Sequence, residues 1–223
     1  MTLTAQEHKR VTDAVAKAER GTAGEIVTVV AERSDGYTDV ALAWSALAAL
    51  LALCTLAIVP DPFLALYDRV SGGWVHEWTP RQIFSLAAGV AALSFGAMML
   101  LQIIPALRFF LVPAPIKAKR VHERALKAFR IGAEHRTAGG TGILIYLSMR
   151  EHRAEILGDA PIASVVSGDT WSATLEALLS GVRQGDVAAG MCAAVERVGA
   201  ILAEHFPRQE DDVNELPDRL IEV

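Results

Sequence analysis

Residues 40–59 read VALAWSALAALLALCTLAIV, a stretch without a charged side chain that decides how the chain is organised. At 1.5 Å per residue a helix of this length reaches about 30 Å, the thickness of the hydrocarbon core of a bilayer. Residues 82–107 form a second uncharged stretch, QIFSLAAGVAALSFGAMMLLQIIPAL. A soluble chain would need a much larger surrounding domain to bury two such helices. We therefore predict transmembrane helices over residues 40–59 and 83–107, joined by an external loop over residues 60–82.

Composition limits the classes of protein to which the chain can belong. The 223 residues include 21 Lys and Arg against 26 Asp and Glu, for a net charge of -5, and the mean hydropathy is +0.32. This acidic balance argues against a nucleic-acid partner, because nucleic-acid-binding proteins normally show a basic surface. The two cysteines, Cys54 and Cys192, are too few for a disulfide framework or a cysteine-based zinc site.

Basic residues flank the two uncharged stretches unevenly. Residues 60–82 contain only Arg69 and Arg81. The segment after the second stretch carries Arg108, Lys117, Lys119, Arg120, Arg124, Lys127 and Arg130. Lys and Arg accumulate on the cytoplasmic side of membrane helices. We therefore predict a multi-pass protein of the inner (plasma) membrane with both termini in the cytoplasm, and the lipid bilayer as its first partner.

The second stretch also predicts how the hairpin packs. Gly89, Ala92 and Gly96 would let the two helices approach closely, as small residues do in lipid. Pro105 is expected to kink or end the second helix. Neither span carries an ionisable residue, which disfavours a subunit of a transporter or channel.

The polar segments on both sides of the hairpin contain strand patterns. Residues 25–31 and 142–148 are apolar runs typical of buried strands, and residues 153–157 form a partner strand after a short turn. A strand over residues 25–31 needs partners at its edges. We therefore expect it to lie beside residues 142–148, on the far side of the hairpin in the sequence.

This pairing predicts one discontinuous α/β domain, formed by residues 1–36 and 117–207. Its helices are expected over residues 4–20, 117–136, 170–181 and 186–205. Residues 208–223, with six acidic residues and two arginines, are expected to form a flexible acidic tail.

Short sequence motifs in these polar segments resemble those of the TPM domain family. Residues 22–27, TAGEIV, resemble the opening strand of that family. Residues 142–148, GILIYLS, followed by RAEI at 153–156, resemble its central hairpin. Further similarity in the C-terminal helical region involves Gly185, Asp186, Gly190, residues 195–199 and residues 205–207. The resemblance covers residues 1–35 and 117–207, and it is to a bacterial integral-membrane subgroup of the family.

The resemblance implies an α/β/α sandwich, interrupted here by a two-helix transmembrane hairpin. The family is associated with a thylakoid-lumen acid phosphatase, with binding of calcium or other divalent cations, and with maintenance or assembly of membrane proteins. Family members often carry acidic residues in the hairpin turn, where residues 149–152 of this chain read MREH. This departure favours a domain without a cofactor, with a divalent cation such as calcium as the alternative.

Four carboxylates near the ends of the expected strands are the candidate metal ligands: Glu25, Glu155, Asp159 and Asp169. Calcium needs six to eight oxygen ligands, so several of these groups would have to converge. The competing interpretation is that they are helix caps and solvated strand ends. No catalytic residue is assigned, because the sequence contains no His-Glu-x-x-His, Gly-x-Ser-x-Gly or phosphate-loop pattern.

The sequence thus predicts a membrane-anchored TPM-like α/β protein without an assigned molecular activity. A role in the maintenance or assembly of membrane proteins, and hence other membrane proteins as partners, follows from the resemblance. The alternative is a metal-dependent acid phosphatase or a domain that binds divalent cations. Whether the protein is an enzyme stays open at this point.

Overall fold

The computed structural model describes residues 3–71, 78–134, 137, 139–208 and 215–223. The chain divides into two compact units. The first combines Met1–Asp35 with Ala114–Val223, and we call it the α/β domain. The second, Gly36–Pro113, is called the helical hairpin. The two units are described separately.

A four-stranded mixed sheet forms the centre of the α/β domain, with the strand order β3-β2-β1-β4. Strand β1 (Glu25–Ala31) runs parallel to β2 (Gly142–Ser148), in a register from Glu25 opposite Gly142 to Ala31 opposite Ser148. Every residue of both strands is buried, as their continuous apolar runs predict. The expected pairing of these two distant segments is therefore confirmed, and so is the α/β class.

Two shorter strands complete the sheet. Strand β3 (Arg153–Gly158) pairs antiparallel with β2, as its position after a tight turn predicts. Strand β4 (Ile221–Glu222) pairs parallel with the other edge of β1, with Val29 opposite Ile221. His152 adopts a φ of 49° in the turn before β3, a left-handed conformation that is uncommon for residues other than glycine.

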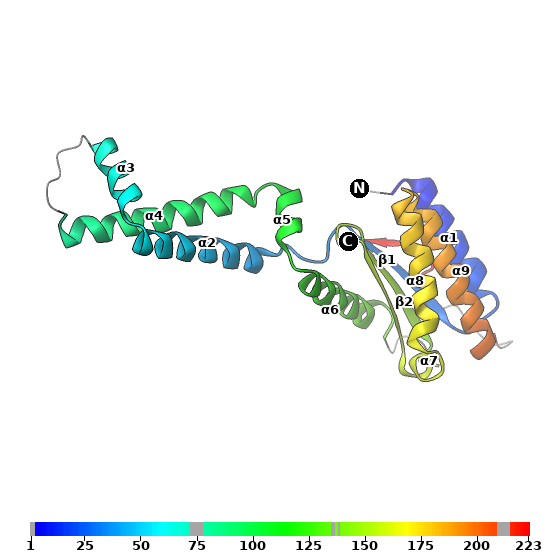
Figure 1. Cartoon of the computed structure of the whole chain (residues 1–223). Helices are drawn as coiled ribbons and strands as arrows, with labels where there is room; N and C mark the ends of the chain where they lie inside the picture. The colour runs from blue at the N-terminus through cyan, green and yellow to red at the C-terminus, as the bar shows by residue number, and fades with distance from the viewer. Residues whose placement is uncertain (1–2, 72–77, 135–136, 138, 209–214) are drawn as a thin grey trace. The chain divides into compact units, whose positions relative to one another are not determined.

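Three helices pack on one face of the sheet, as Figure 1 shows. They are α1 (Ala5–Glu19), α8 (Gly168–Arg183) and α9 (Val187–His205), and a short helix, α7 (Ala160–Val165), follows β3. Thr4 and Glu7 form a capping box at the start of α1, as the sequence indicates. Helices α8 and α9 approach so closely that a Cβ atom on Gly190 would lie 2.5 Å from the carbonyl oxygen of Leu178.

The opposite face of the sheet is packed against α6 (Ala114–Gly132). Val121, Ala125 and Phe129 recur every four residues along this helix, and they contact the side chains of Val27, Leu144 and Tyr146 in one buried cluster. Helix α6 ends at Gly132, although the predicted helix extends to residue 136. Residues 135 and 136 lie outside the described residues.

The helical hairpin contains α2 (Thr38–Ile58), α3 (Asp61–Ser71), α4 (Pro80–Leu101) and α5 (Pro105–Leu111). Helices α2 and α4 lie side by side in Figure 1. They are antiparallel, because Gln102, just after α4, donates a hydrogen bond to the carbonyl of Ala41 near the start of α2. Both are long and apolar enough to cross a membrane.

Two boundaries in the hairpin differ from those expected. Residues 60–82 were predicted to be a loop, but α3 occupies 61–71 and α4 begins at Pro80, capped by Thr79 and Gln82. The rest of that loop, residues 72–77, lies outside the described residues. The second helix was predicted to reach residue 107, but α4 ends at Leu101 and Pro105 starts α5. The reason is that proline holds the preceding residue, Ile104, in an extended conformation (φ -71°, ψ 113°).

The expected role of the glycines in the hairpin is wrong. A Cβ atom added at Gly89 or Gly96 would have no other atom within 4 Å, so neither glycine lies where the helices touch. The less exposed positions of α2 instead include Ala41, Ser45 and Ala48, spaced four and three residues apart. Ala87, Ala91 and Ser94 are likewise among the less exposed positions of α4, so small residues do line the contact, but Gly89 is not one of them.

The expectation of a flexible tail over residues 208–223 is wrong for residues 215–223. Leu216 and Leu220 are buried, and Ile221–Glu222 forms β4. The backbone N–H groups of Glu215 and Leu216 donate to the carboxylate of Glu25, and the backbone N–H of Leu3 donates to Glu222. Apolar residues at 216, 220 and 221 thus anchor a segment whose acidic composition suggests a solvated chain. Residues 209–214 lie outside the described residues.

Candidate functional site

The carboxyl ends of the parallel strands β1 and β2 carry a group of interacting polar side chains. Ser34 follows β1, Ser148 ends β2, and Glu151 lies in the turn before β3. Ligands of open α/β sheets commonly bind at this edge. We call Ser34, Tyr146, Ser148 and Glu151 the hydroxyl cluster.

Short hydrogen bonds connect all members of the hydroxyl cluster. The Ser148 hydroxyl donates to Oε2 of Glu151 at 2.5 Å, and the Ser34 hydroxyl donates to Ser148 at 2.8 Å. Oε1 of Glu151 accepts the backbone N–H of Ser34 at 3.1 Å, and the Tyr146 hydroxyl lies 3.1 Å from that of Ser34. Burial raises the pKa of Tyr146, while the Ser34 hydroxyl and the Arg124 guanidinium act in the opposite direction.

The hydroxyl cluster is built to hold two loops together rather than to attack a substrate. Ser148 is fully buried and Glu151 is 7% exposed, so neither reaches a substrate without a rearrangement. Both carboxylate oxygens of Glu151 already accept hydrogen bonds from the chain. An activated serine needs a base that can receive its proton and an accessible oxygen. The cluster instead fastens the segment after β1 to the β2–β3 turn, and Arg150 extends this link by pairing with Glu32 at 2.8 Å.

An apolar cavity of about 200 Å³ adjoins this cluster, between α6 and the sheet. Tyr146 belongs to both features, because its hydroxyl joins the cluster while the residue lines the cavity. The other lining residues are Val27, Val29, Arg124, Lys127, Ala128, Ile131, Gly132, Ile221 and Val223. The sequence analysis missed both features, since they depend on segments more than a hundred residues apart.

The structure distributes the four predicted metal ligands over different parts of the α/β domain. Glu25 is buried at the amino end of β1, where its oxygens accept the N–H groups of Glu215 and Leu216 at 3.3 and 3.2 Å. Asp159, also buried, accepts the N–H of Gly142 at 3.0 Å from the residue before α7. These two carboxylates lie at the same end of the sheet, because Gly142 is the register partner of Glu25.

The other two predicted ligands lie elsewhere. Glu155 is opposite Tyr146 in the middle of the β2–β3 pair, and its Oε2 lies 3.3 Å from Nδ1 of His122 on α6. Asp169 lies in the first turn of α8, where an acidic residue is favoured by the helix dipole. Within the part of the chain that the structure describes, no three His, Cys, Asp or Glu side chains are grouped closely enough to hold a metal ion.

A buried carboxyl group that the sequence did not single out lies beside Glu25. Glu19, at the end of α1, is 9% exposed, and its Oε1 accepts the backbone N–H of Ile26 at 2.7 Å. Burial raises the pKa of Glu19 to about 8, and the negative charges of Glu25 and Asp218 act in the same direction. Glu19 is therefore protonated at neutral pH. The sequence did not indicate that Glu19 is buried, because charged residues at the end of an amphipathic helix are ordinarily solvated.

No protein-family model matches the sequence, and no curated protein matches it. The chain is similar in fold to the BA42 protein from the psychrophilic bacterium Bizionia argentinensis, whose structure was solved by NMR. The TM-score is 0.56 and the sequence identity 22%, and the match covers 100% of this chain and 97% of that chain. At this level of identity the similarity concerns the fold alone.

Proposed function

We propose that this chain is a multi-pass protein of the inner membrane, in which α2 and α4 span the bilayer and hold a TPM-like α/β domain in the cytoplasm. The observation that carries the proposal is the exposure of two long apolar helices. In their most apolar 18-residue windows, only 11% of α2 and none of α4 is buried. A core helix of a soluble protein would be buried over much of its surface.

The polar groups inside the hairpin support the same proposal. Gln102 is 4% exposed, and its side-chain amide donates to the carbonyl of Ala41 at 3.1 Å, to Ser45 at 3.3 Å and to the carbonyl of Met98 at 3.1 Å. The Ser45 hydroxyl in turn donates to the carbonyl of Ala41 at 2.9 Å. Polar groups within a bilayer must find their hydrogen-bond partners inside the protein, and the side chains of Gln102 and Ser45 do so.

Helix α3 and the residues near it are suited to the interface between a bilayer and water. Tyr67 packs against Trp78 with the ring centroids 5.1 Å apart, and Leu66 and Val70 are exposed on the same helix. Aromatic side chains with a polar edge are enriched where a bilayer meets water. At the other end of the hairpin, the indole of Trp44 donates to the carbonyl of Leu111 at 3.0 Å. Each end of the hairpin thus carries an aromatic residue suited to an interface.

We further propose that the α/β domain is a TPM-like α/β/α sandwich that acts as a binding module in the maintenance or assembly of membrane proteins. The support is the central parallel pair β1–β2, the β2–β3 hairpin, and helices on both faces of the sheet. The fully buried Ser148 and the dispersed carboxylates give no support to the alternative, a metal-dependent acid phosphatase, in the residues that the structure describes.

Reporter fusions test the membrane topology. We expect a fluorescent protein fused to the C-terminus to fluoresce, and alkaline phosphatase to be active only when it is inserted within residues 68–78. As a control, alkaline phosphatase fused to the C-terminus should be inactive. Active phosphatase at the C-terminus, or recovery of the protein in the soluble fraction after alkaline carbonate extraction, would contradict the proposal.

A further inference from the structure

We propose that the cavity between α6 and the sheet binds a free fatty acid, with part of the acyl chain inside the cavity and the carboxylate between Arg124 and Lys127. This inference goes beyond the proposed function. The cavity belongs to the α/β domain alone, so it can be filled whether or not α2 and α4 cross a membrane.

The lining of the cavity suits a hydrocarbon chain. Its floor is formed by Val27, Val29 and Tyr146, and Ile221 and Val223 of the C-terminal segment contribute a further wall. Among the described residues, the lining contains one polar side chain besides Arg124 and Lys127, that of Tyr146, whose hydroxyl interacts with Ser34 and with Arg124. An apolar cavity of about 150 Å³ accommodates benzene, so a volume of about 200 Å³ should take roughly six to eight carbon atoms.

Two of the α6 residues that line the cavity, Ala128 and Gly132, have small side chains or none, and this leaves space beside the sheet. Ala128 and Gly132 are four residues apart and therefore lie on the same side of the helix. A Cβ atom on Gly132 would meet Cγ1 of Val27 at 3.7 Å, an ordinary contact, so the glycine is not required by close packing. Strand β4, which forms the edge of the sheet beside β1, has only two residues. It therefore covers little of β1 next to the cavity.

The charges beside the cavity select an anion. Other basic residues of α6 are paired: Lys119 with Glu123, Arg120 with Asp35, and Arg130 with Glu134. Arg124 and Lys127, the two that line the cavity, have no carboxylate within ion-pair distance among the described residues. Both are exposed and three residues apart on one helix, so a single carboxylate can lie near both. A chain with one apolar tail and one anionic end complements this arrangement.

Photo-crosslinking of the full-length protein in phosphatidylcholine nanodiscs tests the proposal. A fatty acid with a diazirine near its methyl end should label peptides from α6, β1, β2 and β4. Unlabelled fatty acids of increasing length should compete about fourfold more strongly for each added methylene, and the gain should stop at roughly eight carbons, where the cavity is full. Affinities are calculated from the free aqueous concentrations, because simple partition into lipid keeps rising with chain length.

Matched variants separate the two parts of the site. Ala128→Leu fills the cavity and should abolish labelling, while Ala114→Leu, at an exposed position of the same helix, should leave it unchanged. Arg124→Gln and Lys127→Gln should each weaken binding roughly two- to fivefold, whereas Arg130→Gln should not. Circular dichroism checks that every variant is folded, and the charge variants keep the test valid if Ala128→Leu does not fold.

Several outcomes would overturn the inference. Labelling confined to α2 and α4 would show that the fatty acid binds lipid-facing helices instead. A fatty alcohol that competes as well as the acid of equal length would remove the role of Arg124 and Lys127. Displacement of the probe by phosphatidylglycerol, but not by free fatty acids, would assign the cavity to a bilayer lipid.

Discussion

Replacement of Glu19 by glutamine should change how the stability of the α/β domain depends on pH. Glu19 is nearly fully buried at the end of α1, and burial is the main cause that raises its pKa to about 8. In the unfolded chain the group titrates near 4.5. Between these values the folded state binds one proton more than the unfolded state, so the free energy of unfolding falls as the pH rises through this window.

The size of this effect follows from the pKa. A rise from 4.5 to about 8 corresponds to at most roughly 5 kcal/mol, because one pKa unit is worth about 1.4 kcal/mol. This stability is fully present below about pH 4.5, and its loss is complete near pH 8, where Glu19 ionises in the folded protein beside Glu25 and Asp218. Glutamine has nearly the same shape and does not ionise. The variant should therefore match the wild type only below about pH 4.5, exceed it by a growing margin as the pH rises to about 8, and keep a constant margin above pH 8.

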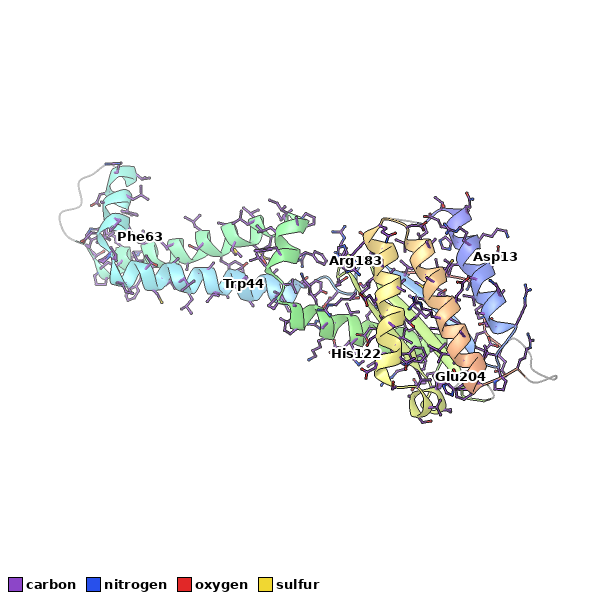
Figure 2. The ribbon with its side chains drawn as sticks, turned by 45° about the vertical axis from the view of Figure 1, so that its right-hand side comes forward. Asp13, Trp44, Phe63, His122, Arg183 and Glu204 are labelled. Carbon is purple, nitrogen blue, oxygen red and sulfur yellow. The ribbon has the colours of Figure 1, made fainter. Side chains whose placement is uncertain are left out.

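Denaturant unfolding provides the assay. Trp171 on α8 reports on the α/β domain once Trp44, Trp74 and Trp78 are replaced by Phe, and guanidinium titrations at pH 5 to 9 then give the free energy of unfolding. Glu204→Gln is the matched control, because Glu204 is exposed near the end of α9 (Figure 2). If Glu19→Gln and the wild type kept parallel pH profiles, the reasoning about the buried carboxyl would be refuted.

Three further predictions concern packing and ligands. Gly190→Ala should destabilise the α/β domain by roughly 1–3 kcal/mol in the same unfolding assay, because its Cβ would lie 2.5 Å from the carbonyl oxygen of Leu178. The control variant Gly132→Ala should be close to neutral. Equal effects of the two substitutions would contradict the packing of α8 on α9. Gln102→Leu should destabilise the hairpin by about 1 kcal/mol in detergent, because Ala41 and Ser45 lose a donor; unchanged thermal unfolding would refute this role. Millimolar calcium should not raise the melting temperature. A specific site at 100 times its dissociation constant would add about 2.7 kcal/mol, so a rise of several degrees that is lost in Glu25→Ala or Asp159→Ala would contradict us.

The sheet was predictable where the sequence contains continuous apolar runs. The apolar runs at residues 25–31 and 142–148 predict burial on both faces, which the helices on the two sides of the sheet provide, while mutual pairing satisfies the backbone hydrogen bonds of the two strands. Strand β4 was missed because two residues carry no periodic signal, and because the acidic residues around it indicate a solvated chain. Its anchoring depends on Glu25, more than 190 residues earlier, which accepts two backbone hydrogen bonds from residues 215 and 216.

The candidate site was less predictable than the fold. The hydroxyl cluster joins Ser34 to Ser148 and Glu151 across the whole hairpin insertion, and each of these residues alone is an ordinary polar residue in a turn or at a strand end. The strand-end positions of Glu25 and Asp159 suggested metal ligands, but their oxygens accept backbone N–H groups in the folded domain. Sequence position thus located the carboxylates at one end of the sheet but could not give the partners of their oxygens.

Cysteine accessibility in native membranes tests most directly whether α2 and α4 span a bilayer. Leu50 and Leu93, near the middle of the two helices, are 57% and 76% exposed without lipid. In a chain with Cys54 and Cys192 replaced by alanine, we expect cysteines at positions 50 and 93 to resist a water-soluble maleimide in membranes and to react after SDS is added. A cysteine at position 204 should react in both conditions, once the membranes are opened. Rapid reaction at positions 50 and 93 in intact membranes would contradict the membrane-spanning hairpin.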